Sequence, residues 1–319
     1  MITRKPIAIY YEHPRWFEKL FAELDRRGVP YLRLDARRHQ YDPHTGDGDF
    51  ALVFNRMSPS AYTRGAGQAL FYTLGWLEHL EARGVRVVNG SSAFRTETSK
   101  ARQAQLVSAL GLPYPATRVI NHPDEAPRAA EGLRFPVLVK PNIGGSGAGI
   151  QRYDTPAELD GATRKGFVET GPDGTALVLE FITARGQCIT RVEVLGGKYL
   201  YAIRIHLAGE TYNLCPGSIC QTADGATLER TTCPADAPKS GLTVEGVTPP
   251  PEVIAAVERV MQAAGIEVGG VESIVDDRDG RLYYYDINAL SNFVADAPRV
   301  VGFDPFARLV DYLEKEAQR

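Results

Sequence analysis

A short apolar strand followed at once by a glycine-rich loop, at residues 134–150, constrains the fold more than any other feature of the sequence. In Val137-Leu138-Val139-Lys140 the side chains alternate between two faces, so Lys140 lies on the face of Leu138. Pro141 ends the strand, because proline has no N–H for a β-ladder. Four of the next residues are glycines: Gly144, Gly145, Gly147 and Gly149. Glycines accept positive φ and leave backbone N–H groups open, so this loop can wrap an anion beside the lysine.

The loop has a plainer interpretation as a hairpin or a surface turn between two strands. Its residues do not follow the order of a P-loop or of a dinucleotide-binding turn. Ser146 does not fit a nucleophile elbow either, because Ala148 stands where the second glycine is needed. The rest of the chain must therefore decide between an anion-binding loop and a simple turn.

Length and charge restrict the class of partner. The 319 residues, of which 44% are hydrophobic, predict two or three lobes with buried cores. A net charge of −3 argues against nonspecific binding to nucleic acid or to an anionic membrane. The apolar run at residues 7–11 is too short for a signal segment, and no stretch is long enough to span a bilayer. We therefore expect a cytoplasmic protein with a small-molecule partner, whose four cysteines (188, 215, 220 and 233) stay as thiols.

Strand and helix patterns alternate through the first 95 residues. Strands are expected at 7–11, 31–34, 51–54 and 85–88, and helices at 15–27 and 66–83. This alternation predicts a parallel sheet covered on both faces, in which ligands collect beyond the carboxyl ends of the strands. Glu12, His13 and Arg56 fall at that rim. The alternative for each is a solvated loop residue, which is favoured for His13 and weighs equally for Arg56.

The rest of the chain predicts a second, more antiparallel part. A helix at 98–110 has Lys100 at its start, and a strand is expected at 176–181. Two alternating strands at 190–195 and 198–206, joined by Gly196-Gly197, contain Arg191 and Arg204. A helix at 252–264, a strand pair at 270–276 and 281–287, and a closing helix after Pro305 complete the chain.

The last strand pair contains an unusual set of polar residues. Glu272 and Asp286 interrupt strands rich in Val, Ile and Tyr, and Asn288 projects from the same face as Asp286. Carboxylate and amide oxygens are hard ligands that suit Mg²⁺, which also keeps water and phosphate ligands. The alternative is a polar cluster that caps the end of a strand.

Taken together and in this order, the motifs resemble those of the ATP-grasp superfamily. They are Lys100, the Val-Leu-Val-Lys140-Pro strand with its glycine loop, Leu-Glu180-Phe-Ile182, Arg191 and Arg204 on a hairpin, Gly-Val-Glu272, and Tyr-Asp286-Ile-Asn288. The resemblance covers nearly the whole chain and is closest to the branch of ribosomal-protein glutamate ligase and glutathione synthetase. It implies an α/β fold with a parallel-sheet pre-ATP-grasp domain at 1–97, followed by two α+β lobes that grip the nucleotide: a lid subdomain at 98–185 and a C-terminal subdomain with the metal site at 186–319.

The resemblance also implies roles for individual residues. Lys100 and Lys140 would contact the phosphates of ATP, and the loop of Gly144, Gly145, Ser146, Gly147 and Gly149 would close over them. The adenine edge would meet Glu180, Phe181 and Ile182, and Gln187 is the nearest candidate for the ribose, because the acidic residue expected there is missing. Glu272, Asp286 and Asn288 would bind Mg²⁺, with Mn²⁺ as an alternative, although the family usually has these two acids in the reverse order. Arg204, with Lys140, would be catalytic and would stabilise the transferred phosphoryl group.

The implied activity is that of an ATP-dependent carboxylate–amine ligase, which forms an amide through an acyl phosphate. A small-molecule kinase and a non-catalytic ATP sensor remain as alternatives. The substrates, an acid and an amine that include amino acids or peptides, would meet Glu12, Arg56, Arg191, Asn213, Ser291 and Asn292. The family also suggests a homodimer.

Overall fold

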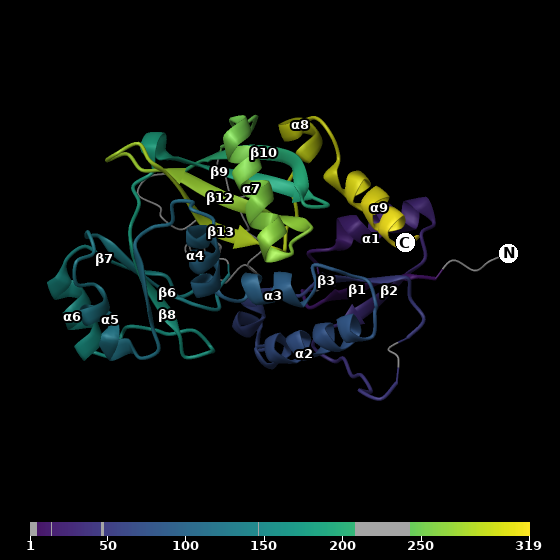
Figure 1. Ribbon diagram of the computed structural model, residues 1–319, viewed down its shortest axis with the longest axis horizontal. Coiled ribbons are helices and arrows are strands. Elements are labelled where there is room, and N and C mark those ends of the chain that lie inside the picture. The colour runs from purple at the N-terminus through teal and green to yellow at the C-terminus, as the bar shows by residue number, and fades with distance from the viewer. Residues whose placement is uncertain (1–4, 14, 46–47, 146, 208–242) are drawn as a thin grey trace, which may run out of the picture.

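The computed structural model describes residues 5–13, 15–45, 48–145, 147–207 and 243–319. Three sheets organise this part of the chain (Figure 1), and one falls within each of the three segments 1–97, 98–185 and 186–319. The division into domains at these boundaries stays a prediction. One hydrophobic cluster joins residues of the first and the last segment. None of the helices in the described ranges has the length and apolar character needed to cross a membrane.

The N-terminal sheet is parallel, as the alternating pattern predicted. Its order is β2-β1-β3-β4, with β1 Ile7–Tyr11, β2 Tyr31–Asp35, β3 Leu52–Arg56 and β4 Val87–Val88. Helix α1 (Glu18–Arg27) packs Leu20 and Leu24 on the face of Ile7 and Ile9, and ends at Gly28 with a φ of 65°. Helix α2 (Gln68–Ala82) covers the opposite face.

The middle sheet is antiparallel and belongs to the segment with the glycine loop. Its order is β5-β8-β6-β7, with β5 Thr117–Ile120, β8 Ala176–Glu180, β6 Val137–Pro141 and β7 Gln151–Tyr153. Helices α5 (Ala126–Ala129) and α6 (Pro156–Arg164) cover one face over Val137 and Val139. The loop at 142–150 joins β6 to β7, so the hairpin alternative describes its topology correctly.

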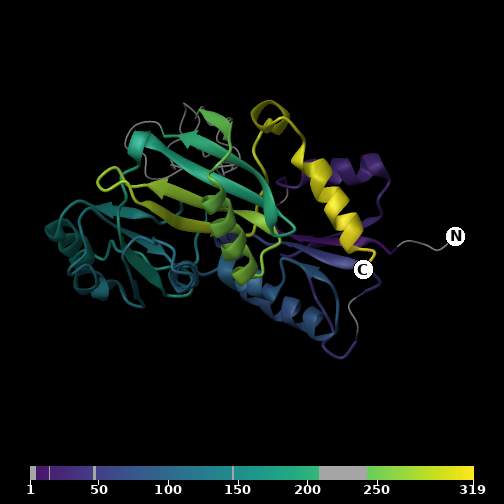
Figure 2. The ribbon, with the colours of Figure 1, turned by 45° about the horizontal axis from the view of Figure 1, so that its top comes forward.

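The C-terminal sheet is larger and is also antiparallel. Its order is β11-β10-β9-β12-β13, with β11 Val244–Val247, β10 Lys198–His206, β9 Cys188–Leu195, β12 Val268–Val275 and β13 Leu282–Asn288. One face packs on α7 (Pro251–Ala264), α3 (Ser91–Glu97) and α4 (Lys100–Ala109). On the other face, residues of β9, β10 and the start of β12 share a core with α1 and the N-terminal sheet. Helices α8 (Ala297–Val301) and α9 (Pro305–Glu316) close this core. Figure 2 shows α9 beside α1, so the two ends of the chain meet in one core.

Candidate active site

A cavity of about 480 Å³ lies where the three sheets meet. The middle sheet contributes Lys140 and the glycine loop, and the C-terminal sheet contributes Glu272, Asp286 and Asn288. The N-terminal part contributes Trp16 and the 3-10 turn η1 (Pro59–Arg64) with its capping Ser58. Most of the predicted phosphate-binding residues and all three predicted metal-binding residues therefore face one common space.

Two lysines reach this cavity from elements that one asparagine ties together. Lys100 begins α4, and its backbone N–H donates to the carbonyl of Asn142 over 3.1 Å. The side-chain oxygen of Asn142 accepts from Ser99 Oγ at 3.1 Å and from the Ala101 N–H at 2.9 Å. Because Asn142 follows β6 by one residue, these bonds fix the start of α4 beside the end of the strand that carries Lys140.

The two lysines have different electrostatic surroundings. Burial would lower the pKa of Lys100, but the nearby carboxylates of Asp286 and Glu97 outweigh it and raise that pKa; Lys100 Nζ is paired with Asp286 Oδ1. Burial and the positive charge of Lys100 lower the pKa of Lys140 to about 8. Lys140 Nζ lies 3.5 Å from Tyr114 Oη, a weak contact that leaves its charge poorly compensated. The pair therefore presents concentrated positive charge to the cavity.

Beside the lysines, an acidic row crosses the last two strands of the C-terminal sheet. Glu272 and Asp286 are register partners on β12 and β13, and Asn288 Nδ2 donates to Asp286 Oδ2 over 3.1 Å. Burial and the Asp286 charge raise the pKa of Glu272. Burial would also raise the pKa of Asp286, but Lys100 and Lys140 outweigh it and lower that pKa. Two adjacent, partly desolvated carboxylates of this kind favour a cation between or beside them.

This donor set fits Mg²⁺ by its chemistry. Two carboxylates and an amide oxygen are hard ligands, and they are too few to fill an octahedral shell without water or phosphate oxygens. Because these three donors leave coordination positions open, the row suits an ion that is shared with a bound phosphate better than a closed protein site. In the described ranges, no three His, Cys, Asp or Glu side chains gather at a potential metal site.

The glycine loop forms the wall between the middle sheet and the N-terminal part. Gly144, Gly145 and Gly147 line the cavity. A Cβ at Gly145 would lie 3.0 Å from Ser60 Cβ, so the loop backbone packs closely against η1. Gly149 does not line the cavity, but its φ of 73° turns the loop back into β7. The remaining predicted loop residue, Ser146, lies outside the described residues.

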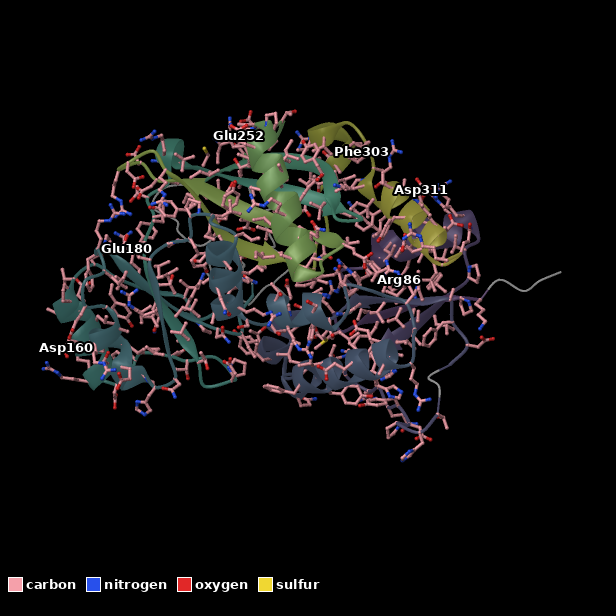
Figure 3. The ribbon with its side chains drawn as sticks, viewed as in Figure 1. Arg86, Asp160, Glu180, Glu252, Phe303 and Asp311 are labelled. Carbon is pink, nitrogen blue, oxygen red and sulfur yellow. The ribbon has the colours of Figure 1, made fainter. Side chains whose placement is uncertain are left out.

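The segment after β8 forms the apolar end of the cavity. Glu180, Phe181, Ile182 and Gln187 line it, as do Leu138, Leu179 and Ile274. The carboxylate of Glu180, labelled in Figure 3, accepts from the Arg134 N–H at 2.9 Å and pairs with the Arg134 guanidinium. The side chain of Glu180 is therefore already paired with Arg134 within the protein. A flat apolar group can lie between these walls and meet the backbone of residues 180–182.

Arg204 is not among the residues that line the cavity. It lies on β10 opposite Thr190, and its neighbour Ile203 is the partner of Arg191. Since side chains alternate along a strand, Arg204 projects from the face opposite Arg191 and Glu272. Its side chain is 44% exposed, and its guanidinium pairs with Glu245 at 3.3 Å. The structure does not bring Arg204 to the two lysines, and its catalytic role stays a prediction.

The predicted substrate residues mostly contact one another or other protein groups. Arg56 Nη2 donates to the carbonyl of Ser291 and to Asn292 Oδ1, the latter over 3.2 Å. Glu12 is buried and pairs with Arg64 at 2.6 Å. Arg191 is buried in the C-terminal sheet and does not line the cavity. The last of the set, Asn213, lies outside the described residues.

Several cavity residues were not predicted. Glu97 is buried beside Lys100, accepts from the Ala289 N–H, and burial raises its pKa to about 7. It lies at the end of α3 and belongs to no motif, so no sequence pattern marks it. Tyr285 donates to Glu272 Oε2 over 2.8 Å. The pairing of β12 with β13 shifts register between Glu272 and Ser273. Such a β-bulge changes the direction of a side chain, so Tyr285 points towards Glu272 although simple alternation places it on the other face.

Comparison of the sequence with those of known proteins finds distant relatives. No protein-family model matches the chain. A probable alpha-L-glutamate ligase of Teredinibacter turnerae is 29% identical over 204 residues, which cover 63% of this chain and 65% of that protein. The tetrahydromethanopterin:alpha-L-glutamate ligase of Methanosarcina acetivorans is 32% identical over 152 residues, covering 44% of this chain and 45% of that protein. This chain therefore spans less than two thirds of the length of these relatives.

Solved structures match over nearly the whole chain. D-alanine–D-alanine ligase from Bacillus anthracis complexed with ATP has a TM-score of 0.66 at 15% identity, and the match covers 99% of this chain and 97% of that chain. The ATP-grasp ligase PsnB complexed with minimal precursor has a TM-score of 0.67 at 17% identity, covering 98% of this chain and 99% of that chain. At such identities the likeness is one of fold.

Proposed function

We propose that this chain, which has the ATP-grasp fold predicted from its motifs, is an ATP-dependent carboxylate–amine ligase. The observation that carries the proposal is the convergence of Lys100 and Lys140 with Glu272, Asp286 and Asn288 on one cavity, where Lys100 pairs directly with Asp286. Phosphoryl transfer depends on positioning and on charge stabilisation, and it needs no covalent protein nucleophile. The ligase names of the distant relatives support the same reaction class.

ATP is the proposed nucleotide and Mg²⁺ the proposed metal, with Mn²⁺ as an alternative. Lys100, Lys140 and the glycine loop would bind the phosphates, and residues 180–182 would meet the adenine, with Gln187 nearest the ribose. Glu272, Asp286 and Asn288 would hold Mg²⁺. When bound, the ion neutralises phosphate charge that the two lysines alone would leave uncompensated.

The proposed reaction has two steps. The substrate carboxylate attacks the γ-phosphorus of ATP, which gives an acyl phosphate and releases ADP. The amine then attacks the acyl carbon, and the products are an amide, inorganic phosphate and a proton. In both steps the lysines orient the phosphate oxygens and stabilise their negative charge, while the glycine loop and η1 limit the access of water.

The substrates are proposed as a small carboxylic acid and an amine, either of which can be an amino acid or a peptide. Glutamate is the first candidate, because it appears in the names of the relatives. We also propose the three-segment organisation at 1–97, 98–185 and 186–319, a cytoplasmic location, and a homodimer.

The experiment that tests the proposal is a two-substrate screen of ADP release. Purified protein with Mg²⁺ and ATP is supplied with acids alone, amines alone, and acid–amine pairs that begin with L-glutamate, and mass spectrometry identifies the product. A ligase requires both substrates and yields an amide. ADP release with a single hydroxyl compound would instead indicate a kinase, and ATP binding without any turnover would indicate a sensor.

A further inference from the structure

A buried ion pair lies on the same face of the C-terminal sheet as the acidic row. The strand register places two cross-strand rows side by side: Arg191, Glu272 and Asp286 form the first, and Glu193, Gly270 and Asn288 form the second. Residues in such rows contact one another across neighbouring strands. Of these six residues, only Glu272, Asp286 and Asn288 line the cavity, so Arg191 and Glu193 lie behind its wall.

The contacts connect this ion pair directly to Glu272. Arg191 Nε donates to Glu193 Oε1 over 2.6 Å, and Arg191 Nη1 donates to Glu272 Oε1 over 3.0 Å. The other oxygen of Glu272 accepts from Tyr285 Oη. Each oxygen of Glu272 therefore has one fixed protein donor and still keeps a lone pair that can face the cavity.

Gly270 provides the room for this arrangement. A Cβ built on it would lie 2.9 Å from Glu193 Oε2 and 3.1 Å from Arg191 Nε. Any other residue at this position would push the carboxylate or the guanidinium away. The backbone of β12 thus allows the ion pair to sit flat on the sheet beside Glu272.

We propose that Arg191 and Glu193 are positioning residues for the metal–nucleotide site: Glu193 orients the guanidinium of Arg191, and Arg191 together with Tyr285 orients the carboxylate of Glu272. The inference rests on the proposed function, because it concerns how Glu272 meets Mg²⁺. It also assigns Arg191 a place outside the substrate-binding set in which the sequence placed it. Groups that orient a metal ligand commonly change metal affinity by about 10-fold to 100-fold when they are removed.

A purely structural role is the alternative, since a buried ion pair also affects folding. Replacing both partners with apolar residues of similar volume removes the pair at constant net charge, and such replacements are often neutral or stabilising. Glu272 then keeps its hydrogen bond from Tyr285 and loses the one from Arg191. The double variant Arg191→Met/Glu193→Leu has the same net charge as the native pair. Stability and metal-dependent binding can therefore be separated in one protein.

The experiment measures ATP binding by calorimetry in Mg²⁺ and again in EDTA, together with the temperature of thermal unfolding. We expect the double variant to stay folded, as its unfolding temperature will show, and to bind ATP at least about 10-fold more weakly in Mg²⁺, with unchanged affinity in EDTA. Glu193→Gln, which keeps the size of the side chain, should show the same loss and decides the question if the double variant does not fold. The matched control is Lys198→Met, which removes an exposed ion pair with Glu258 from the neighbouring hairpin and should change neither affinity.

Native affinity in Mg²⁺ for either folded variant would overturn the inference while leaving the proposed function intact. An equal loss in Mg²⁺ and in EDTA would also overturn it, because that pattern indicates general damage to the cavity. Native protein whose ATP binding does not respond to Mg²⁺ would overturn both the inference and the metal-dependent function.

Discussion

At the scale of single residues, the two lysines of the cavity differ in how much each gains from a bound anion. Lys100 already has a carboxylate partner in Asp286, so a phosphate must compete for it. Lys140 Nζ makes a weak contact with Tyr114 Oη, and burial and repulsion by Lys100 lower its pKa although Asp286 and Glu272 attract it. A bound phosphate would relieve that repulsion, so Lys140 gains more from the ligand than Lys100 does.

Replacing Lys140 should therefore abolish turnover without harming the fold. In Lys140→Ala, the loss of a cation that faces the transferred group is expected to lower the rate of ADP formation by at least about 100-fold. The free energy of unfolding should stay the same or rise, because the variant removes a desolvated charge next to Lys100. ADP release and urea denaturation measure the two effects. Normal turnover in the folded variant would remove Lys140 from the site.

The lowered pKa of Lys140 predicts a specific pH dependence of nucleotide affinity. Below about pH 8 the amine is charged and attracts phosphate; above it the neutral amine does not. Binding of an anion favours the protonated form, so affinity should fall as pH rises, towards about 10-fold per pH unit above pH 8. Calorimetric titrations with ATP between pH 7.5 and 9.5 test this.

Lys140→Arg provides the control for that titration, because arginine stays charged throughout this range. Its affinity is expected to be nearly flat with pH. If the native protein shows no fall, or if Lys140→Arg falls as steeply as the native protein, another group is responsible.

At the scale of elements, the path from β6 to β7 depends on one glycine that does not line the cavity. Gly149 has a φ of 73°, and a Cβ there would lie 2.7 Å from Pro141 Cγ. Pro141 directly follows Lys140, so a clash at Gly149 would displace the end of the strand that positions the lysine. Gly174 has nearly the same φ, 71°, but a Cβ there meets nothing within 4 Å.

This pair of glycines separates backbone strain from the clash. Gly174→Ala should lower the free energy of unfolding by about 1–2 kcal/mol, because alanine disfavours the left-handed conformation. It should leave kcat/KM for ATP unchanged. Gly149→Ala should cost a further ~1–3 kcal/mol and lower kcat/KM for ATP at least about 10-fold. Denaturation curves and steady-state kinetics measure both. Equal kinetics in the two variants would show that Pro141 yields without moving Lys140.

The same elements show what a sequence can reveal. Alternation and charge placed Glu272, Asp286 and Lys140 correctly on strands, because buried acids and amines stand out against apolar neighbours. Tyr285 was missed because a register shift, which leaves no trace in the pattern, turns it towards Glu272. Arg56 and Asn292 fit a substrate site as polar residues on a rim, yet they bind each other, and only the fold brings residues so distant in sequence together.

At the scale of the whole molecule, the cavity exists because the first and last segments share a core. Residues of β1, α1, β10 and α9 pack in one hydrophobic cluster. At its edge, Arg86, labelled in Figure 3, donates to Glu267 Oε1 over 2.9 Å and to Glu316 Oε2 over 2.7 Å. These contacts fix the N-terminal sheet against the strand that leads to Glu272, so movement of one displaces the other.

Asn89 is the polar centre of this junction. It follows β4, is 1% exposed, and adopts a φ of 57°, which asparagine tolerates better than most residues. Its Nδ2 donates to the carbonyls of Val268 and Ala289 over 2.6 and 2.7 Å. Its Oδ1 accepts from the backbone N–H groups of Glu267 and Val268 at 2.9 and 3.1 Å. One side chain thus satisfies four backbone groups, which lie at the start of β12 and directly after the end of β13.

Asn89→Ala should therefore destabilise the protein far more than the loss of an ordinary hydrogen bond. Leaving several buried backbone groups without partners is expected to lower the free energy of unfolding by about 3–5 kcal/mol, and Asn89→Gly should recover about 1 kcal/mol of this by relieving the left-handed φ. Ser92→Ala is the matched control, because it removes one bond, of 3.1 Å to the Ala264 carbonyl, across the same junction and should cost about 1 kcal/mol. Urea denaturation measures all three variants. If Asn89→Ala were no less stable than Ser92→Ala, water or a small backbone shift would be replacing the amide, and the junction would not depend on Asn89.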